Sequence, residues 1–175
     1  TQFGSLNRGT LIQAKGKEYS LLDLVDSARH AKRFERGWYA TIYLSPRDYH
    51  RIHSPNCGQV RAVGYIPGHL WPVNPLSVRH VDRLFAVNER LISYLETPDL
   101  GCVAVVKVGA TCVGRISLSY ETLRTNPRFR RRREIELEVG VPVSHGDELG
   151  VFELGSTVIV LVEREDFSFD PSLPQ

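Results

Sequence analysis

The segment at residues 158–162, Val-Ile-Val-Leu-Val, constrains the fold more than any other part of the chain. β-Branched residues favour strands, and an uninterrupted apolar run of this length is typical of a strand buried on both faces. Val151 and Phe152 approach the run from the other side of the tetrapeptide Leu-Gly-Ser-Thr at residues 154–157. The tetrapeptide is therefore predicted to lie between two anchored strands.

The Gly155-Ser156 pair inside this tetrapeptide is a candidate for self-cleavage. A serine hydroxyl can attack the carbonyl carbon of its own preceding peptide bond, and a preceding glycine helps because it has no Cβ to cover that carbonyl. The acyl group then moves from nitrogen to oxygen, and elimination across Cα and Cβ breaks the chain. The dehydroalanine that remains hydrolyses to a pyruvoyl group and ammonia. The alternative is an ordinary turn, because Gly-Ser-Thr is common between strands.

Composition indicates one globular domain with a sizeable core, since 175 residues are 42% hydrophobic and 24% charged. A net charge of +2 is too small to indicate nucleic-acid binding. The longest apolar run, residues 102–114, is interrupted by Lys107 and falls short of the ~20 residues that cross a bilayer, so no membrane span is predicted. Cys57, Cys102 and Cys112 lack metal-type spacing, which favours reduced thiols in a cytoplasmic protein.

Short strands dominate the rest of the pattern. Ser20 is the predicted N-cap of a short helix at 21–28, and residues 77–85 are a second predicted helix. Residues 140–150 are interpreted as a turn-rich connector and 167–175 as a frayed tail. The predicted strands are 10–14, 38–44, 60–65, 91–95, 102–106 and 111–116. This pattern predicts a mainly antiparallel β-sandwich or barrel-like fold with a few short helices, in a single domain at 1–175.

Two histidines follow a predicted strand end. Pro46 stops the strand before it and delivers His50 and His53 onto a loop, where reactive side chains often lie. An imidazole titrates near neutrality and can take the proton of Ser156. Surface or capping roles are the alternative. A metal site shared with Cys57 would have three loosely spaced ligands, so no metal site is predicted.

Two surface features have both a structural and a membrane interpretation. Residues 70–73, Leu-Trp-Pro-Val, are either a packed loop or a lip that contacts lipid, with Trp71 suited to the interface. Arginines concentrate at residues 128–133, ahead of glutamates at 134–138. This arginine cluster is either a solvated, locally neutralised strand face or a patch attracted to an anionic membrane, at about 1 kcal/mol per arginine.

Several motifs together resemble one family, the phosphatidylserine decarboxylase proenzymes of bacteria, which are pyruvoyl-dependent. The resemblance rests on residues 43–55, Tyr-Leu-Ser-Pro-Arg-Asp-Tyr-His-Arg-Ile-His-Ser-Pro, and on Leu-Gly-Ser-Thr at 154–157. Further similar segments occur in the family's order at 13–16 with Tyr19-Ser20, 65–68, 88–90 and 108–111. The resemblance covers the chain from about residue 1 to residue 162.

The resemblance implies a two-stage function. Cleavage between Gly155 and Ser156 would give a β chain, 1–155, and an α chain, 156–175, whose first residue is a pyruvoyl cofactor made from Ser156. Its ketone would form a Schiff base with phosphatidylserine and accept the electrons left when carbon dioxide departs, giving phosphatidylethanolamine. The implied enzyme is a carboxy-lyase. Thr157 is interpreted as a hydrogen-bond donor to the oxyanion or to Ser156.

The resemblance also assigns roles to the histidines. His53 corresponds to the family's charge-relay histidine for self-cleavage, and His50 to its histidine implicated in decarboxylation. The family's relay acid is an aspartate in an Ala-Asp-Gly segment that precedes the stretch matching Thr1, and Asp48 does not correspond to it. The chain is therefore interpreted as N-terminally truncated. It is expected to cleave slowly or not at all, because the imidazole lacks the acid that holds its tautomer.

The implied partners are phosphatidylserine, an anionic membrane surface and the complementary chain of the same proenzyme, without nucleic acid. The implied location is peripheral, on the cytoplasmic face of the cell membrane. The oligomeric state stays open, a homodimer included. Two other hypotheses remain. Residues 146–152 also resemble the strand-turn-strand of lipoyl-type carriers and sugar-transport phosphocarriers, although neither Lys15 nor Lys107 has a carrier lysine's setting. Alternatively, the chain is an inert fragment that keeps the fold.

Overall fold

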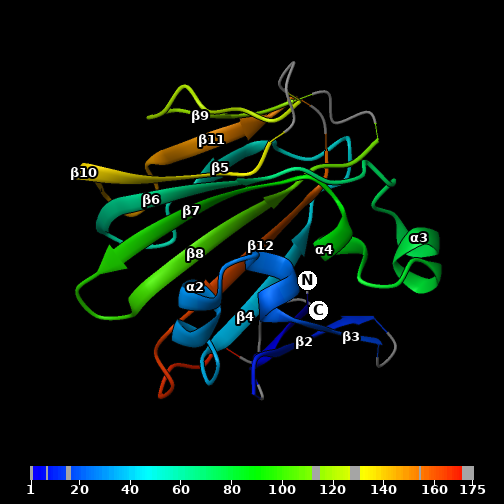
Figure 1. Ribbon diagram of the computed structural model, residues 1–175, viewed down its shortest axis with the longest axis horizontal. Coiled ribbons are helices and arrows are strands. Elements are labelled where there is room, and N and C mark those ends of the chain that lie inside the picture. The colour runs from blue at the N-terminus through cyan, green and yellow to red at the C-terminus, as the bar shows by residue number, and fades with distance from the viewer. Residues whose placement is uncertain are drawn as a thin grey trace.

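The computed structural model describes residues 2–6, 8–14, 17–111, 115–126, 131–153 and 155–170, with the backbone alone at 12–14. The described chain is mainly antiparallel β-structure with four short helices, as the sequence predicts. Its strands form a seven-stranded sheet, a three-stranded sheet and a two-stranded hairpin (Figure 1). Among the described residues, no helix combines the length and hydrophobicity that crossing a bilayer requires.

The large sheet has the order β1-β4-β12-β8-β7-β6-β10. Because β1 and β10 form its two edges and are not paired with each other, the sheet is open and the fold is sandwich-like rather than a closed barrel. Its strands are β1 (Gln2–Ser5), β4 (Trp38–Tyr43), β12 (Thr157–Val162), β8 (Gly101–Val108), β7 (Arg90–Thr97), β6 (Gly58–Ile66) and β10 (Arg133–Val143).

Strand β12 is the valine-rich run that the sequence singles out, and it lies inside the large sheet. All six of its residues pair with β4 on one side and with β8 on the other. Leu161 and Ile159 are fully buried. A strand that is hydrogen-bonded on both edges and apolar on both faces has no favourable exposed position, which explains why the run is uninterrupted.

The three-stranded sheet has the order β5-β11-β9 and lies above the large sheet in the view of Figure 1. The strands β2 and β3 form the hairpin. The bounds are β5 (Arg51–His53), β11 (Glu148–Phe152), β9 (Ile116–Leu118), β2 (Thr10–Ala14) and β3 (Lys17–Ser20). Strand β5 corrects the prediction of a loop after Pro46, because His53 lies on this strand and pairs with Glu148.

The helices are shorter than predicted, and the reason is visible at their ends. They are α1 (Leu21–Val25), α2 (Ala28–Arg33), α3 (Pro75–His80) and α4 (Leu84–Val87). Ser20 caps α1 as predicted, accepting a hydrogen bond from Asp23 N at 3.0 Å. Asp26 then takes a left-handed conformation, φ +49°, and ends the helix before residue 28. The predicted helix at 77–85 is divided, because Val81 takes an extended conformation that ends α3 and Arg83, with φ +53°, precedes α4.

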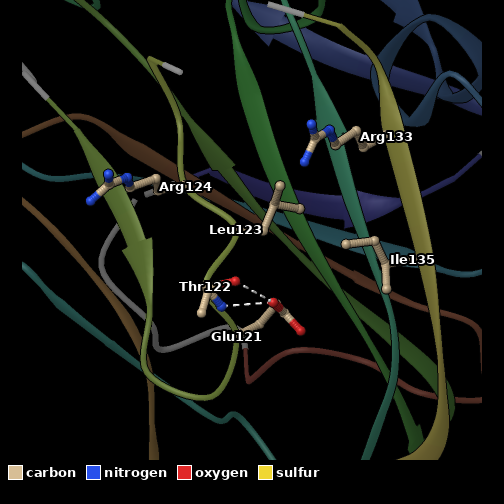
Figure 2. Close-up of a pocket in the computed structure, with 6 residues that line it drawn as sticks. All are labelled: Glu121, Thr122, Leu123, Arg124, Arg133 and Ile135. Carbon is tan, nitrogen blue, oxygen red and sulfur yellow. Dashed lines mark hydrogen bonds between the residues drawn. The ribbon is translucent and has the colours of Figure 1, made fainter. Parts of the chain in front are cut away.

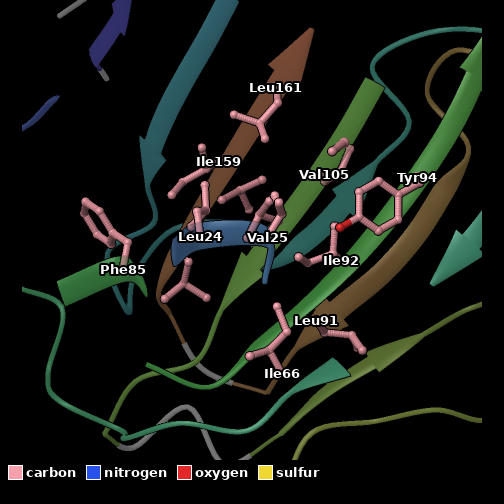
Figure 3. Packing of buried hydrophobic residues seen from close by; sticks show 14 of the residues in the cluster. Leu24, Val25, Ile66, Phe85, Leu91, Ile92, Tyr94, Val105, Ile159 and Leu161 are labelled. Atoms are coloured by element: carbon pink, nitrogen blue, oxygen red, sulfur yellow. The ribbon is translucent and has the colours of Figure 1, made fainter. Parts of the chain in front are cut away.

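The core extends over both larger sheets, and part of it lies between the large sheet and helix α1. Leu24 and Val25 of α1 pack toward Ile159, Leu161 and Ile92 of the sheet (Figure 3). Because these side chains are almost completely removed from water, each contributes about 1.5–3 kcal/mol by burial. The core therefore holds β12, and with it the Gly155-Ser156 junction, in a rigid surrounding.

Three further predictions need correction or fall outside the description. The connector predicted at 140–150 is strand on both sides of a short turn, because β10 reaches Val143 and β11 begins at Glu148. The predicted tail is anchored at its start, where the ring centroid of Phe169 lies 5.5 Å from that of Phe3. The predicted strand at 111–116 lies partly outside the described residues, and β9 begins at Ile116.

Candidate active site

Gly155 lies against the backbone of the Leu-Ser-Pro segment at 44–46. A Cβ built on Gly155 would stand 2.6 Å from the Leu44 oxygen and 2.8 Å from the Pro46 nitrogen. Both are backbone atoms, so they cannot move aside as a flexible side chain can. Position 155 is therefore restricted to glycine by close approach, and the restriction comes from a segment about 110 residues earlier in the chain.

Ser156 is buried, with 1% of its surface exposed. Its hydroxyl donates to the Val108 carbonyl at 2.5 Å, and its own carbonyl accepts from Leu44 N at 2.6 Å. The next residue, Thr157, is also fully buried, and its Oγ1 has no hydrogen-bond partner among the described residues. A buried hydroxyl without a partner is costly, so Thr157 is suited to a group that appears only during a reaction.

The short motifs on which the family resemblance rests are connected to one another in space. Gly68 lies against the Val87–Asn88 backbone, where a Cβ would stand 2.5 Å from the Val87 oxygen. Gly109 N donates to the Glu89 carbonyl at 2.7 Å. The Glu89 carboxylate accepts from the Tyr65 hydroxyl at 2.5 Å. Gly109 directly follows Val108, whose carbonyl accepts from the Ser156 hydroxyl. The motifs at 65–68, 88–90, 108–111 and 154–157 therefore meet at one end of β12.

Arg90 connects the motif at 88–90 to helix α1. Its guanidinium is buried and donates to the backbone carbonyls of Leu24 and Asp23 of α1 at 2.8 and 3.0 Å, and to that of Asn88 at 2.6 Å. Burial lowers the pKa of Arg90 to about 10, so it stays charged at neutral pH. The arginine therefore fastens helix α1 to β7 and is a structural member of the motif at 88–90.

His53 does not contact Ser156 in this structure. Its Nδ1 donates to the Gly146 carbonyl at 2.6 Å, and its Nε2 accepts from the Tyr49 hydroxyl at 2.7 Å. The Tyr49 ring stacks on the imidazole, with centroids 5.6 Å apart. Since a carbonyl can only accept, the Gly146 contact fixes the proton on Nδ1 and leaves Nε2 as the basic nitrogen.

His50 is partly buried and contacts the end of strand β11. Its carbonyl accepts from Phe152 N at 3.0 Å, so the histidine lies beside the strand end that leads to Gly155. Its Nε2 is buried and has no hydrogen-bond partner among the described atoms. Asp48 accepts from Ser45 N at 2.7 Å and so closes the turn after Pro46, which agrees with leaving it out of the relay.

Lys107 is a buried lysine to which the sequence analysis assigned no role. It has no exposed surface, and its Nζ donates to the Ser93 hydroxyl at 2.6 Å. Ser93 in turn shares a hydrogen bond of 2.5 Å with the Tyr120 hydroxyl. Desolvation lowers the pKa of Lys107 to about 7. The signal in the sequence is one lysine inside an otherwise apolar strand.

A hollow of about 190 Å³ lies away from this site (Figure 2). Arg133, from the arginine cluster at 128–133, and Arg124 line it, but their guanidinium groups do not converge in Figure 2. Glu121 accepts from Thr122 N at 2.7 Å and is occupied locally. The other lining residues are Leu123 and Ile135. No lining residue belongs to the segments around Ser156, so the hollow is not the space beside the junction.

A cluster of one histidine and two glutamates joins α2 to β10. His30 Nε2 lies 3.2 Å from a Glu134 carboxylate oxygen, and Glu136 lies near enough for the three to hold a metal ion. Each glutamate is already paired with an arginine, Arg29 or Arg132. His30 Nδ1 is buried without a partner, which suits the neutral ring that donates from Nε2 to Glu134. The cluster is therefore explained as a hydrogen-bonded ion network.

The fold and the site together define a class of protein: a mainly antiparallel β domain in which a close-packed Gly-Ser peptide opens a central strand. Comparison with known proteins makes this class specific. A family model described as phosphatidylserine decarboxylase matches residues 1–174. The chain belongs to the phosphatidylserine decarboxylase family.

Three similar proteins illustrate the relationship, and each is named phosphatidylserine decarboxylase proenzyme. The protein from Anaeromyxobacter sp. is 50% identical over 175 residues, covering 99% of this chain and 62% of its own length. That from Brevibacillus brevis is 47% identical over 170 residues, 97% of this chain and 61% of its own. The protein from Myxococcus xanthus is 47% identical over 175 residues, covering 100% of this chain and 62% of its own length. The chain thus spans about three fifths of the length of these relatives.

Proposed function

We propose that this chain is the self-cleaving part of a phosphatidylserine decarboxylase, cut between Gly155 and Ser156. Family membership and the relatives' printed name, a proenzyme, support the proposal. The observation that carries it is the junction itself. Gly155 is packed so closely that no side chain fits, and Ser156 presents a buried hydroxyl next to the carbonyl of that glycine.

The first step is an N-to-O acyl shift. The Ser156 hydroxyl leaves the Val108 carbonyl, and its oxygen forms a bond to the Gly155 carbonyl carbon while the Gly155–Ser156 C–N bond breaks. Loss of the Cα proton and of the ester oxygen then gives a Gly155 carboxylate and a dehydroalanine. Water hydrolyses the dehydroalanine and ammonia leaves. The unpartnered Thr157 hydroxyl is our candidate donor to the oxyanion of the first step.

His53 is our candidate base for this step. Its tautomer already has the correct form, because the Gly146 carbonyl accepts from Nδ1 and leaves Nε2 basic. To reach Ser156, the imidazole must leave the Tyr49 hydroxyl. A backbone carbonyl does not stabilise an imidazolium as a carboxylate does, so we propose that the chain cleaves slowly until the family's relay aspartate is supplied.

The residues around position 156 fit a pyruvoyl group, since Ser156 is buried directly before β12 and the neighbouring Thr157 offers a buried hydroxyl without a partner among the described residues. The group supplies a ketone that condenses with the substrate amine and an electron sink for the bond that loses carbon dioxide. We assign the return of a proton to the substrate Cα to His50. Its Nε2, which has no hydrogen-bond partner among the described atoms, is available to carry that proton.

Strand β12 explains how the two chains would stay together after cleavage. Residues 157–162 pair with β4 and β8 along their whole length, and Phe169 packs on Phe3 further along. The bond to be cut lies just before these contacts begin. The α chain would therefore remain clamped in the large sheet while its first residue becomes the reactive group.

The competing carrier hypothesis has less support. A carrier needs an accessible lysine or histidine at a hairpin tip, whereas Lys107 has no exposed surface and lies within β8. Lys15 lies outside the described residues.

For location, we propose peripheral attachment to the cytoplasmic face of an anionic membrane, with the arginine cluster at 128–133 as one contributor.

Intact mass spectrometry tests the proposed function. The chain is compared with a form that carries an added Ala-Asp-Gly-containing segment of a relative ahead of Thr1. We expect the extended form to give two chains separating at Gly155, the C-terminal one lighter than a serine-terminated chain by the mass of one ammonia and reactive toward hydrazine. An extended form that stays whole, or that splits without a reactive ketone, contradicts the proposal.

The two histidines are expected to separate the two stages. In the extended form, His53→Asn should slow cleavage by about 10²–10³-fold, because it removes the base. His50→Asn should leave cleavage within a few-fold of the unchanged protein but lower carbon dioxide release by about 10²-fold. Time courses of cleavage and of carbon dioxide release from phosphatidylserine measure the two effects. Equal loss of cleavage in both variants would contradict the division of roles.

A further inference from the structure

Helix α3 and the loop before it expose apolar side chains to an unusual degree. Leu76 on α3 is 68% exposed, and Leu70 and Trp71 in the loop are 37% and 49% exposed. None of the six residues of α3 is buried. So short a helix gains little stability on its own, and helices normally depend on packing of an apolar face. Figure 1 shows α3 at the margin of the molecule, where it contacts β2 of the hairpin.

The exposed loop is nevertheless held firmly. Asn88 accepts from Trp71 N at 3.1 Å and donates to the Trp71 carbonyl at 2.8 Å, so one buried side chain fixes both backbone groups of the exposed tryptophan. The Thr111 hydroxyl donates to the Leu70 carbonyl. An indole on a fixed backbone is preorganised for contact with a partner, because little entropy remains to be lost.

The same asparagine connects this loop to the reaction site. Asn88 also donates to the Gly109 carbonyl at 2.9 Å. A Cβ on Gly109 would stand 3.2 Å from the Leu70 side chain. Gly109 follows the residue whose carbonyl binds the Ser156 hydroxyl. Leu70 and Trp71 therefore lie at the same end of the sheet as the Gly155-Ser156 junction.

The charges near the apolar side chains are positive or neutralised. Arg79 and His80 in the last turn of α3 are exposed, and His80 Nδ1 donates to the Leu76 carbonyl at 2.8 Å. The nearby Asp82 is paired with Lys17 at 2.6 Å. Apolar side chains, one tryptophan and an arginine, Arg79, that forms no ion pair with the described residues are the combination that favours the interfacial region of an anionic bilayer.

We propose that Leu70, Trp71 and Leu76 form a lip that inserts into the interface of an anionic bilayer and brings the residue-156 site to the lipid headgroups. The choice of a bilayer over a protein partner rests on the proposed function, because phosphatidylserine is held in a membrane. The lip would lie at headgroup depth, with the indole at the boundary between polar and apolar layers.

Tryptophan fluorescence tests the lip directly, because the chain has two tryptophans. Trp38→Phe removes the other one and keeps an aromatic ring beside Phe169. In this background, vesicles containing phosphatidylserine should shift Trp71 emission to shorter wavelength, and brominated acyl chains should quench it. Vesicles of phosphatidylcholine alone should do less. Emission that phosphatidylserine vesicles leave unchanged would overturn the proposal.

A matched pair of leucines provides the control. Leu76→Ser should weaken partition into phosphatidylserine vesicles by about tenfold, the effect of withholding one leucine from an apolar phase. Leu22→Ser, at a leucine that is 53% exposed on α1, should leave partition unchanged. Equal weakening of partition in both variants would overturn the proposed lip. So would a Leu76→Ser protein that changes its oligomeric state instead of its vesicle binding. Because partition is measured without cleavage, the lip can fail while the proposed function stands, and the reverse.

Discussion

Alanine at position 156 is expected to leave the chain whole under conditions in which the extended form divides, a loss of at least about 10⁴-fold in cleavage rate. The reason is that the substitution removes the hydroxyl that attacks the Gly155 carbonyl carbon in the proposed mechanism. The substitution removes one hydrogen bond to Val108, which costs about 1 kcal/mol and leaves the fold intact. Intact mass after long incubation measures the cleavage, and circular dichroism confirms the fold.

Ser119→Ala is the matched control for this experiment. The Ser119 hydroxyl also donates to a strand carbonyl, that of Glu148, but it lies away from the junction. We expect the control to cleave at the rate of the unchanged protein and to give the same amount of hydrazine-reactive product. A Ser156→Ala protein that still divides after Gly155 would remove the serine mechanism. A Ser119→Ala protein that fails to divide would show that the assay reports general perturbation.

The second large effect concerns Lys107, which is expected to destabilise the protein at neutral and acid pH. Its pKa falls from the ordinary 10.5 to about 7 in the folded chain because the ammonium is buried without a carboxylate partner. Between these two values the unfolded chain holds a proton that the folded chain has lost. Unfolding free energy should therefore rise with pH from about 7 to 10.5, by about 1.4 kcal/mol per unit for this group.

Lys107→Met should remove this dependence and stabilise the protein at pH 7 by on the order of 3 kcal/mol. Methionine keeps a similar apolar stem, and Ser93 retains its bond to Tyr120. Urea unfolding at several pH values measures the effect. Lys32→Met, at an exposed lysine of α2, is the control and should change stability little. If the unfolding free energy of Lys107→Met varied with pH as steeply as that of the unchanged protein, the lowered pKa of Lys107 in the folded chain would be contradicted.

Local sequence signals predicted elements well where the signal and the contact lie close together. The valine-rich run at 158–162 became β12, and Ser20 became the cap of α1, because strand packing and capping depend on side chains within a few residues. Helix ends were predicted poorly. Asp26 ends α1 and Arg83 precedes α4 in left-handed backbone conformations, which are uncommon for residues other than glycine and which the helical pattern of the sequence did not indicate.

The candidate site shows the same division. The Gly155-Ser156 pair and the two histidines follow from motifs in the sequence, but their surroundings do not. No local pattern indicates that Ser156 bonds to Val108, or that Tyr49 and Gly146 hold His53. Lys107 was visible as a lysine in an apolar strand, yet its burial depends on Ser93 and Tyr120 from other segments.

By itself, then, the sequence determined the strand-rich class of the fold, the central strand and the peptide bond that opens it. Periodicity and residue type act over a few neighbouring positions, and these are recorded directly in the order of residues. The tertiary structure alone decided why position 155 must be glycine and which groups hold the serine and the histidines. Those answers depend on contacts between segments about 50 to 110 residues apart, and such contacts exist only once the sheets have packed.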